Sequence, residues 1–132
     1  MRRKLGRRGF EPDDIERAVV RLVQQGYLDD VSFASGHVRR RSAVAGPLAL
    51  AAELSRRGVE RAVADQALDG FDRPAQVAAA TRLAVRLAGH VQPAGYRELL
   101  DSVGAKLLRR GFPIGVAREA CRAVWDGTGG TP

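Results

Sequence analysis

Two adjacent carboxylates, Asp29 and Asp30, are the first residues whose types could support chemistry. Paired carboxylates serve as general acid and base, or as ligands of a divalent cation. Aspartate is also a preferred residue at a helix N-terminus, where it accepts hydrogen bonds from free backbone N–H groups and complements the helix dipole. A helical apolar pattern follows the pair, so we favour the capping role and predict that a helix begins here.

The histidines and the single cysteine offer little for metal binding or nucleophilic catalysis. His37 and His90 lack a carboxylate or thiol at the spacing of a zinc site, and we expect both at the edge of helix packing. Cys121 shares an apolar helix face with Ala117 and Val124 and is expected to be buried, away from any base that would activate it. No glycine-rich phosphate loop occurs. The sequence therefore predicts no catalysis, no bound metal, no nucleotide and no other cofactor.

Basic residues are the stronger signal. The chain of 132 residues has 22 lysines and arginines against 15 acidic residues, a net charge of +7 and a pI near 10.9. Such a surface attracts nucleic acid, and arginine forks bind carboxylates equally well, so an acidic protein surface is an equal candidate. Arg39, Arg40 and Arg41 form the densest internal run, and Arg56 and Arg57 follow in the same unit. These five are candidates for partner or DNA binding, against the alternative of a solvated helix face.

The remaining candidate arginines occur in pairs just before glycine, and they are Arg7, Arg8, Arg109 and Arg110. Their first role is expected at helix C-termini, where cations complement the dipole, and a binding role would be additional. Aromatic residues make up 5% of the chain, and none is interleaved with the basic runs. Binding of single strands by base stacking needs that pattern, so direct nucleic-acid binding is the weaker interpretation.

An internal repeat organises these residues. The string Leu, any residue, Arg, Arg, Gly, apolar occurs three times, with its glycines at Gly9, Gly58 and Gly111. The second and third glycines are 53 residues apart, and a Gly-His-Val string recurs with the same offset. The sequence therefore contains a supersecondary unit of about 50 residues, near the upper end of known repeat periods.

Each repeated string is typical of a helix ending, because glycine accepts the left-handed conformation after the last turn and the apolar residue packs back on it. Gly46 and Pro47 mark the start of a helix that ends near Arg57, and Gly26 is expected to end a helix that begins at Pro12. No stretch alternates long enough for a strand. We predict an all-α fold of tandem three-helix repeats, one partial and two complete, in an elongated curved array.

The expected boundaries follow from the repeat. Residues 1–28 form a partial first repeat, residues 29–71 the second, residues 72–126 the third, and residues 127–132 a disordered tail. No apolar run is long enough to span a membrane, and the basic N-terminus lacks the apolar stretch of a secretory signal. We expect a cytoplasmic monomer, with a dimer or tetramer through the exposed first unit as the alternative.

The arrangement resembles the RecX family, regulators of the RecA recombinase. The residues that carry the resemblance are Gly26-Tyr27-Leu28-Asp29-Asp30 with Phe33, Ala34, Val38 and Arg41, then Gly46-Pro47, Leu50, Glu53-Leu54 and Arg57-Gly58-Val59. The linked pair of segments inside a triple repeat is the specific part, and the likeness covers residues 4 to 125. Ala49 and Ala51 stand where the family often has basic residues, and Gly36 lies inside an expected helix.

The resemblance implies three tandem three-helix repeats that bind in the groove of the RecA–single-stranded-DNA filament. It implies a protein that mainly inhibits RecA ATPase, strand exchange and co-protease activity. The alternative is a nucleic-acid-binding helical repeat module that acts without RecA, for which affinity would fall steeply with salt. An enzyme is not expected, because no catalytic constellation supports one.

Overall fold

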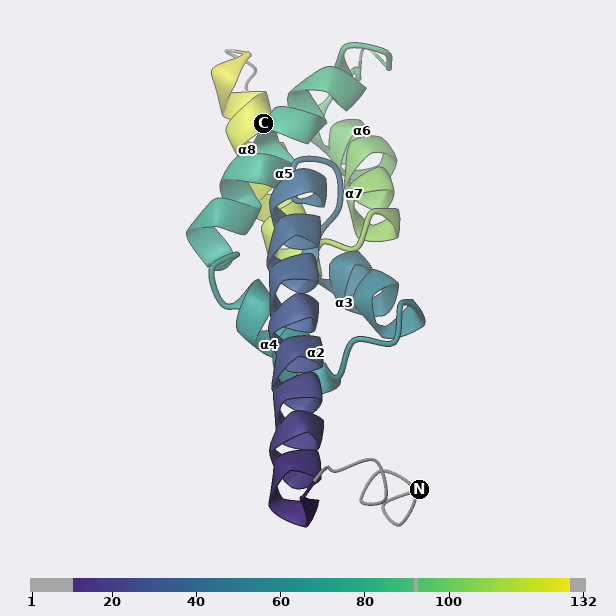
Figure 1. The fold of residues 1–132 in the computed structure, drawn as a ribbon. Helices are drawn as coiled ribbons and strands as arrows, with labels where there is room; N and C mark the ends of the chain where they lie inside the picture. The colour runs from purple at the N-terminus through teal and green to yellow at the C-terminus, as the bar shows by residue number, and fades with distance from the viewer. Residues whose placement is uncertain (1–10, 92, 129–132) are drawn as a thin grey trace.

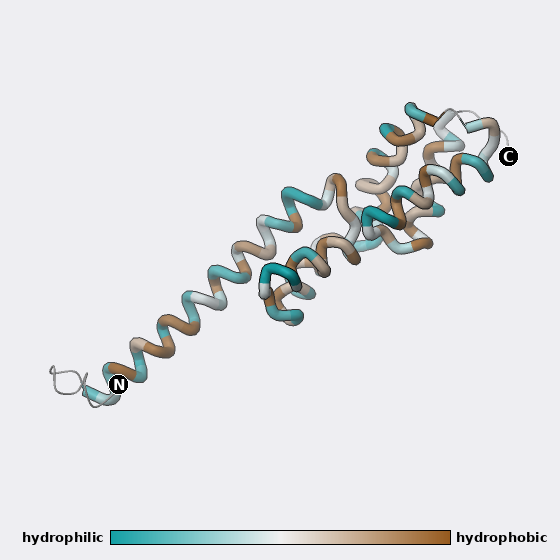
Figure 2. Tube along the Cα trace, turned by 90° about the vertical axis from the view of Figure 1, so that its right-hand side faces the viewer, coloured by the Kyte–Doolittle hydropathy of each residue, from teal (hydrophilic) through white to brown (hydrophobic). Residues whose placement is uncertain are grey.

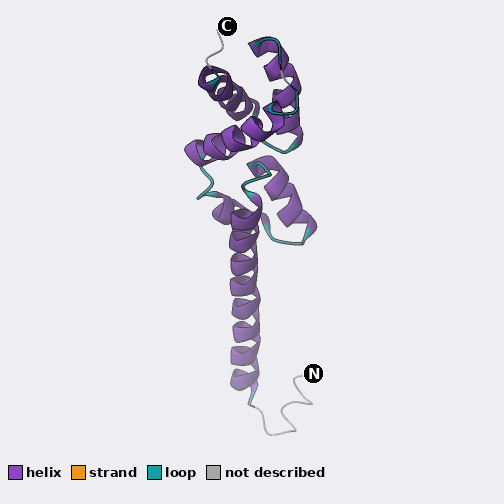
Figure 3. Ribbon diagram, turned by 90° about the horizontal axis from the view of Figure 1, so that it is seen from above, coloured by secondary structure: helices purple, strands orange, loops and turns teal. Residues whose placement is uncertain are grey.

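The computed structural model describes residues 11–91 and 93–128, and every regular element of this part is a helix (Figure 3). The all-α prediction is confirmed. In chain order the elements are α2 (Pro12–Arg41), α3 (Pro47–Arg56), α4 (Arg61–Leu68), α5 (Arg73–Ala88), α6 (Tyr96–Leu99), the π-helical turn η1 (Leu100–Gly104), α7 (Ala105–Arg109) and α8 (Ile114–Gly127).

The helices form two successive units (Figure 1). We call the C-terminal half of α2 with α3 and α4 the second unit, and α5 to α8 the third unit. The C-terminal half of α2 packs on α3 and α4, whereas α5 packs along α8 with the continuous α6–η1–α7 segment beside them. The two units lie one after the other, and the N-terminal half of α2 extends beyond them, so the described part is elongated (Figure 2).

The long helix α2 corrects two predictions. It runs through Gly26 without interruption, so the predicted helix end at Gly26 and the predicted start at Asp29 and Asp30 are both wrong. A glycine inside a helix costs about 1 kcal/mol, whereas two new helix ends would leave several backbone groups without partners. Asp29 lies within the helix, where its Oδ1 accepts a hydrogen bond from Gln25 Nε2 at 2.9 Å.

The N-terminal half of α2 presents apolar side chains to solvent. In the described residues, every position from Glu16 to Asp30 is exposed, and the exposed fraction reaches 73% at Leu22 and 68% at Val23. These apolar positions alternate with polar ones along the helix (Figure 2). This half of α2 therefore gains little stability from tertiary packing within the described part.

The repeated Arg-Arg-Gly strings end their helices as predicted. Gly58 has φ +82° and Gly111 has φ +93°, both in the left-handed region. The N–H groups of Gly58 and Val59 donate to the carbonyls of Ser55 and Leu54. Gly111 and Phe112 form the equivalent bonds at the end of α7, which are those of a Schellman motif. Gly9 lies outside the described residues.

The end of α7 is also bonded to the start of α3, which joins the two units. The Gly46 N–H donates to the Arg110 carbonyl at 2.8 Å, and the Leu48 N–H donates to the Gly111 carbonyl at 3.0 Å. Free donors at one helix N-terminus thus meet free carbonyls at another helix C-terminus, and the helix dipoles favour the contact. Gly46 caps α3 and Pro47 is its first residue, as predicted.

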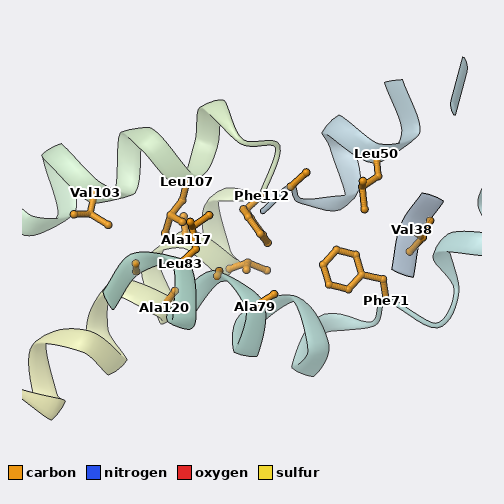
Figure 4. Packing of buried hydrophobic residues seen from close by; sticks show 14 of the residues in the cluster. Val38, Leu50, Phe71, Ala79, Leu83, Val103, Leu107, Phe112, Ala117 and Ala120 are labelled. Carbon is orange, nitrogen blue, oxygen red and sulfur yellow. The ribbon is translucent and has the colours of Figure 1, made fainter. Parts of the chain in front are cut away.

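Only glycine fits on either side of this junction. A Cβ on Gly46 would lie 2.4 Å from the Gly111 carbonyl carbon, and a Cβ on Gly111 would lie 2.4 Å from the Ala49 nitrogen. Phe112, the residue after Gly111, is 1% exposed and lies between Leu107 of the third unit and Leu50 of the second (Figure 4). The junction and the shared core therefore hold the units together.

Replacement of Gly111 by alanine should destabilise the chain much more than the same change at Gly58. Both glycines have positive φ, which costs an alanine about 1–2 kcal/mol. At Gly58 the added methyl group meets open space, so the loss should stop there, whereas at Gly111 it meets backbone and should cost about 1–3 kcal/mol more. The measurement is urea unfolding of G58A and G111A. Equal losses would show that the junction does not couple the units.

Candidate partner-binding surface

Arg41, a predicted binding residue, is held by an ion pair. Its Nε donates to Glu53 Oε1 at 3.1 Å, and its Nη2 donates to Oε2 at 3.0 Å. His37 Nε2 lies 2.7 Å from the same Oε1. The hydrogen bond from Arg41 is the main reason that the pKa of Glu53 lies below its usual value, although partial burial opposes it. The same contact raises the pKa of Arg41. These three side chains join α2 to α3.

Arg57 and Arg110 also make contacts within the fold. The Arg57 guanidinium lies over the ring of Phe33, 5.5 Å from its centroid, and the His37 ring lies 5.8 Å from the same ring. Phe33 is only partly buried, and its ring contacts both the Arg57 guanidinium and the His37 ring. Arg110 follows α7, where its Nη1 donates to the Val44 carbonyl at 3.2 Å. This bond crosses the junction between the units.

Four predicted arginines keep their charge exposed and unpaired: Arg39, Arg40, Arg56 and Arg109. Each is exposed, and no described carboxylate lies within ion-pair distance of them. These four arginines come from three helices. The predicted arginines therefore fall into two groups, those that make contacts within the fold and those that are free on the surface. Arg7 and Arg8 lie outside the described residues.

Four further arginines that are exposed and unpaired in the described part of the chain lie outside the predicted set: Arg21 on α2, Arg82 and Arg86 on α5, and Arg118 on α8. Arg82 and Arg86 are exposed and unpaired on α5, and they lie four residues apart on one helix face. Their spacing was the available signal, but each stands singly between uncharged residues rather than in a basic run. The surface basic residues therefore extend from α2 onto α5.

The residues weighed for metal or nucleophilic chemistry are dispersed. His37 lies at the edge of the packing between α2 and α3 as expected, whereas the prediction for His90 is wrong, because it is exposed in the turn after α5. Cys121 is fully buried, and desolvation raises the pKa of its thiol to about 11. Within residues 11–91 and 93–128 no three His, Cys, Asp or Glu side chains gather as metal ligands, and no helix is long and apolar enough to span a membrane.

The geometry defines the class of protein as an all-α helical-repeat protein with arginines free on its surface. Comparison with known proteins then identifies the family. The family model described as RecX, second three-helix domain, matches residues 29–68. The regulatory protein RecX of Amycolatopsis mediterranei strain U-32 is 32% identical over 119 residues, which cover 89% of this chain and 68% of that protein. The chain belongs to the RecX family.

Other relatives are longer than the chain described here. The regulatory protein RecX of Mycolicibacterium vanbaalenii is 48% identical over 82 residues, which are 60% of this chain and 44% of that protein. The regulatory protein RecX of Geobacillus kaustophilus is 32% identical over 111 residues, covering 83% of this chain and 41% of that one. The match therefore spans less than half of these two relatives.

A solved structure has the same fold. The crystal structure of RecX from Lactobacillus salivarius superposes with a TM-score of 0.71 at 23% sequence identity, and the match covers 93% of this chain and 81% of that one. At this identity the likeness concerns the fold alone.

Replacement of Glu53 by glutamine should lower the free energy of unfolding by about 1–2 kcal/mol at pH 7, because a partly exposed ionic hydrogen bond is lost. A carboxyl whose pKa is lower in the folded than in the unfolded state stabilises the fold at pH values above its pKa in the unfolded state. The difference in free energy of unfolding between E53Q and the parent should therefore be largest above pH 4.5, the ordinary pKa of the unfolded side chain. It should shrink as the pH falls through the lower pKa of the folded state. Urea unfolding across this range measures it.

The matched control is E60Q, which removes an exposed carboxylate that has no ion pair among the described residues. Its effect should be about 0.5 kcal/mol or less. A pH-independent loss in E53Q, or equal losses in the two variants, would contradict a stabilising role for the ion pair.

The Cys121 thiol should react with a disulfide reagent only after unfolding. It is fully buried, and its raised pKa leaves almost no thiolate at neutral pH. The rate of thiol modification in native buffer should be far below the rate in denaturant. Rapid labelling of the native chain would show that the α8 face is open.

Proposed function

We propose that the chain binds the RecA–single-stranded-DNA filament and restrains it, mainly inhibiting RecA ATPase, strand exchange and co-protease activity. The observation that carries this proposal is membership of a regulatory family through the repeat that contains Arg39–Arg41 and Arg56-Arg57. The proposed setting is DNA repair in the cytoplasm, by a monomer that uses no cofactor and catalyses no reaction itself.

The arrangement of free cations supports binding to a filament. Arg39, Arg40, Arg56, Arg109 and Arg82 lie on helices of both units, unpaired within the described residues. An array of stacked helical units offers an extended surface, which suits a partner that is itself helical and repetitive. Arginine contributes strongly to protein interfaces when its guanidinium is desolvated against a carboxylate. The first candidates are therefore these free arginines rather than Arg41, Arg57 and Arg110.

A second candidate function is nucleic-acid binding without RecA, and the net charge of +7 favours it. Binding of this kind would weaken with salt at a slope set by the number of phosphates neutralised. Exposed aromatic residues for stacking are scarce in the described part of the chain: Tyr27 is exposed, whereas Phe71 and Phe112 are buried. We therefore place single-stranded DNA second, as a weak ligand or as part of the filament.

RecA ATPase on single-stranded DNA tests the proposal when the chain is added to preformed filaments over a concentration series. ATP hydrolysis should fall. The R39A/R40A double variant should need about tenfold more protein for half-inhibition, equivalent to about 1.4 kcal/mol. Its matched control is R21A/R118A, which removes two exposed, unpaired arginines elsewhere and should behave as the parent.

Unchanged ATPase at saturating concentration of the parent would contradict the proposal. Equal weakening by both double variants would show that total charge, rather than the surface formed by Arg39 and Arg40, governs inhibition. That second outcome would favour the nucleic-acid alternative.

A further inference from the structure

A groove between α2 and α5 lies where the second unit meets the third. It has a volume of about 560 Å³. Its α2 wall consists of Ser35, Arg39 and Ser42, which the helical spacing of four and three residues brings to one face. Its α5 wall includes Ala78 and Arg82, again four residues apart.

The two arginines give the groove a positive charge that nothing in the described chain neutralises. Arg39 and Arg82 are both exposed, and neither has an ion pair there. None of the residues that line the groove is acidic. By contrast, Arg73 on the same helix α5 is paired with Glu119 at 3.0 Å. The groove is therefore complementary to a ligand with two anionic groups.

The floor of the groove is apolar and made largely of small residues. Val38 and Phe71 lie at its base with Ala79, and all three are buried (Figure 4). Gly70 and Ala75 leave space above them. A floor of this kind accepts an aliphatic side chain and removes it from water.

The floor favours a peptide over a nucleic acid. Phe71 is 6% exposed, so it offers no ring face on which a base could stack. Arginine forks bind carboxylates bidentately, and the groove is lined by one arginine from each helix, Arg39 of α2 and Arg82 of α5, beside apolar residues. A segment with an aliphatic side chain between two carboxylates matches both features.

We infer that this groove is the docking site for an acidic segment of a protein partner, with carboxylates at Arg39 and Arg82 and an aliphatic side chain on the floor between them. The inference deepens the proposed function, since it assigns where a protein partner is held and by which chemistry. Arg39 and Arg82 are also candidates for filament binding, whereas the apolar floor belongs to the groove alone.

The test is binding of a fluorescein-labelled peptide in which glutamate and leucine alternate, measured by anisotropy with the full chain at physiological salt. The R39A/R82A variant should bind at least about tenfold more weakly, as expected when two anchor arginines are removed. The R21A/R118A variant has the same net charge as R39A/R82A, but it should bind the peptide as tightly as the parent does. Substitution of glutamate–serine for glutamate–leucine in the peptide should also weaken binding.

A second variant tests the floor without changing charge. Ala78 is exposed and lines the groove, so A78W should fill it, fold normally and weaken binding. Its control is A62W, which places the same side chain on an exposed site of α4. Circular dichroism of all variants checks the fold.

Three outcomes would overturn the inference: no binding of the peptide, equal weakening by both arginine double variants, or no effect of A78W. A fourth is tighter binding of an oligothymidylate of equal charge that also depends on Arg39 and Arg82, which would make the groove a phosphate site. No RecA is present in this test, so its failure is distinguishable from failure of the ATPase prediction.

Discussion

The hydrogen bonds between the C-terminus of α7 and the N-terminus of α3 fix how one helical unit lies against the next. Every helix end leaves backbone groups that need partners, and here two ends of opposite polarity satisfy each other. The contact requires glycine at positions 46 and 111, because a Cβ on either would meet backbone. It also brings Phe112 into a core that both units share. The Arg-Arg-Gly string that ends α7 therefore also connects the third unit to the second.

Contacts within and between the units divide the arginines into two groups. Arg110 donates a hydrogen bond across the junction to the Val44 carbonyl. Arg41 of α2 is held by an ion pair with Glu53 of α3. Arg39, Arg56 and Arg82 make no such contact among the described residues and remain free on the surface. The fold thus uses part of its positive charge internally and leaves the rest to attract acidic or phosphate groups. For a protein of the RecX family, the free arginines are the ones to examine for a partner.

Local signals in the sequence were sufficient for the fold class and for most helix ends. The Arg-Arg-Gly strings predict both left-handed glycines, because that conformation depends on a few neighbouring residues. Gly26 and Asp29 were misleading, because a helix continues through weak breakers when its ends would otherwise be unsatisfied. The roles of Arg41 and Arg110 depend on partners 12 and 66 residues away, which no local pattern encodes. Arg82 stands singly in the sequence, and only the tertiary fold brings it to the same groove as Arg39.

The proposed function requires the chain to recognise the RecA filament rather than nucleic acid alone. The most direct measurement is fluorescence anisotropy of the labelled chain, titrated with preformed RecA–single-stranded-DNA filaments and, separately, with the same DNA without RecA at physiological salt. Binding to the filament should be at least about tenfold tighter than binding to the bare strand, a difference of about 1.4 kcal/mol. Equal affinity for both, with the same steep salt dependence, would contradict it.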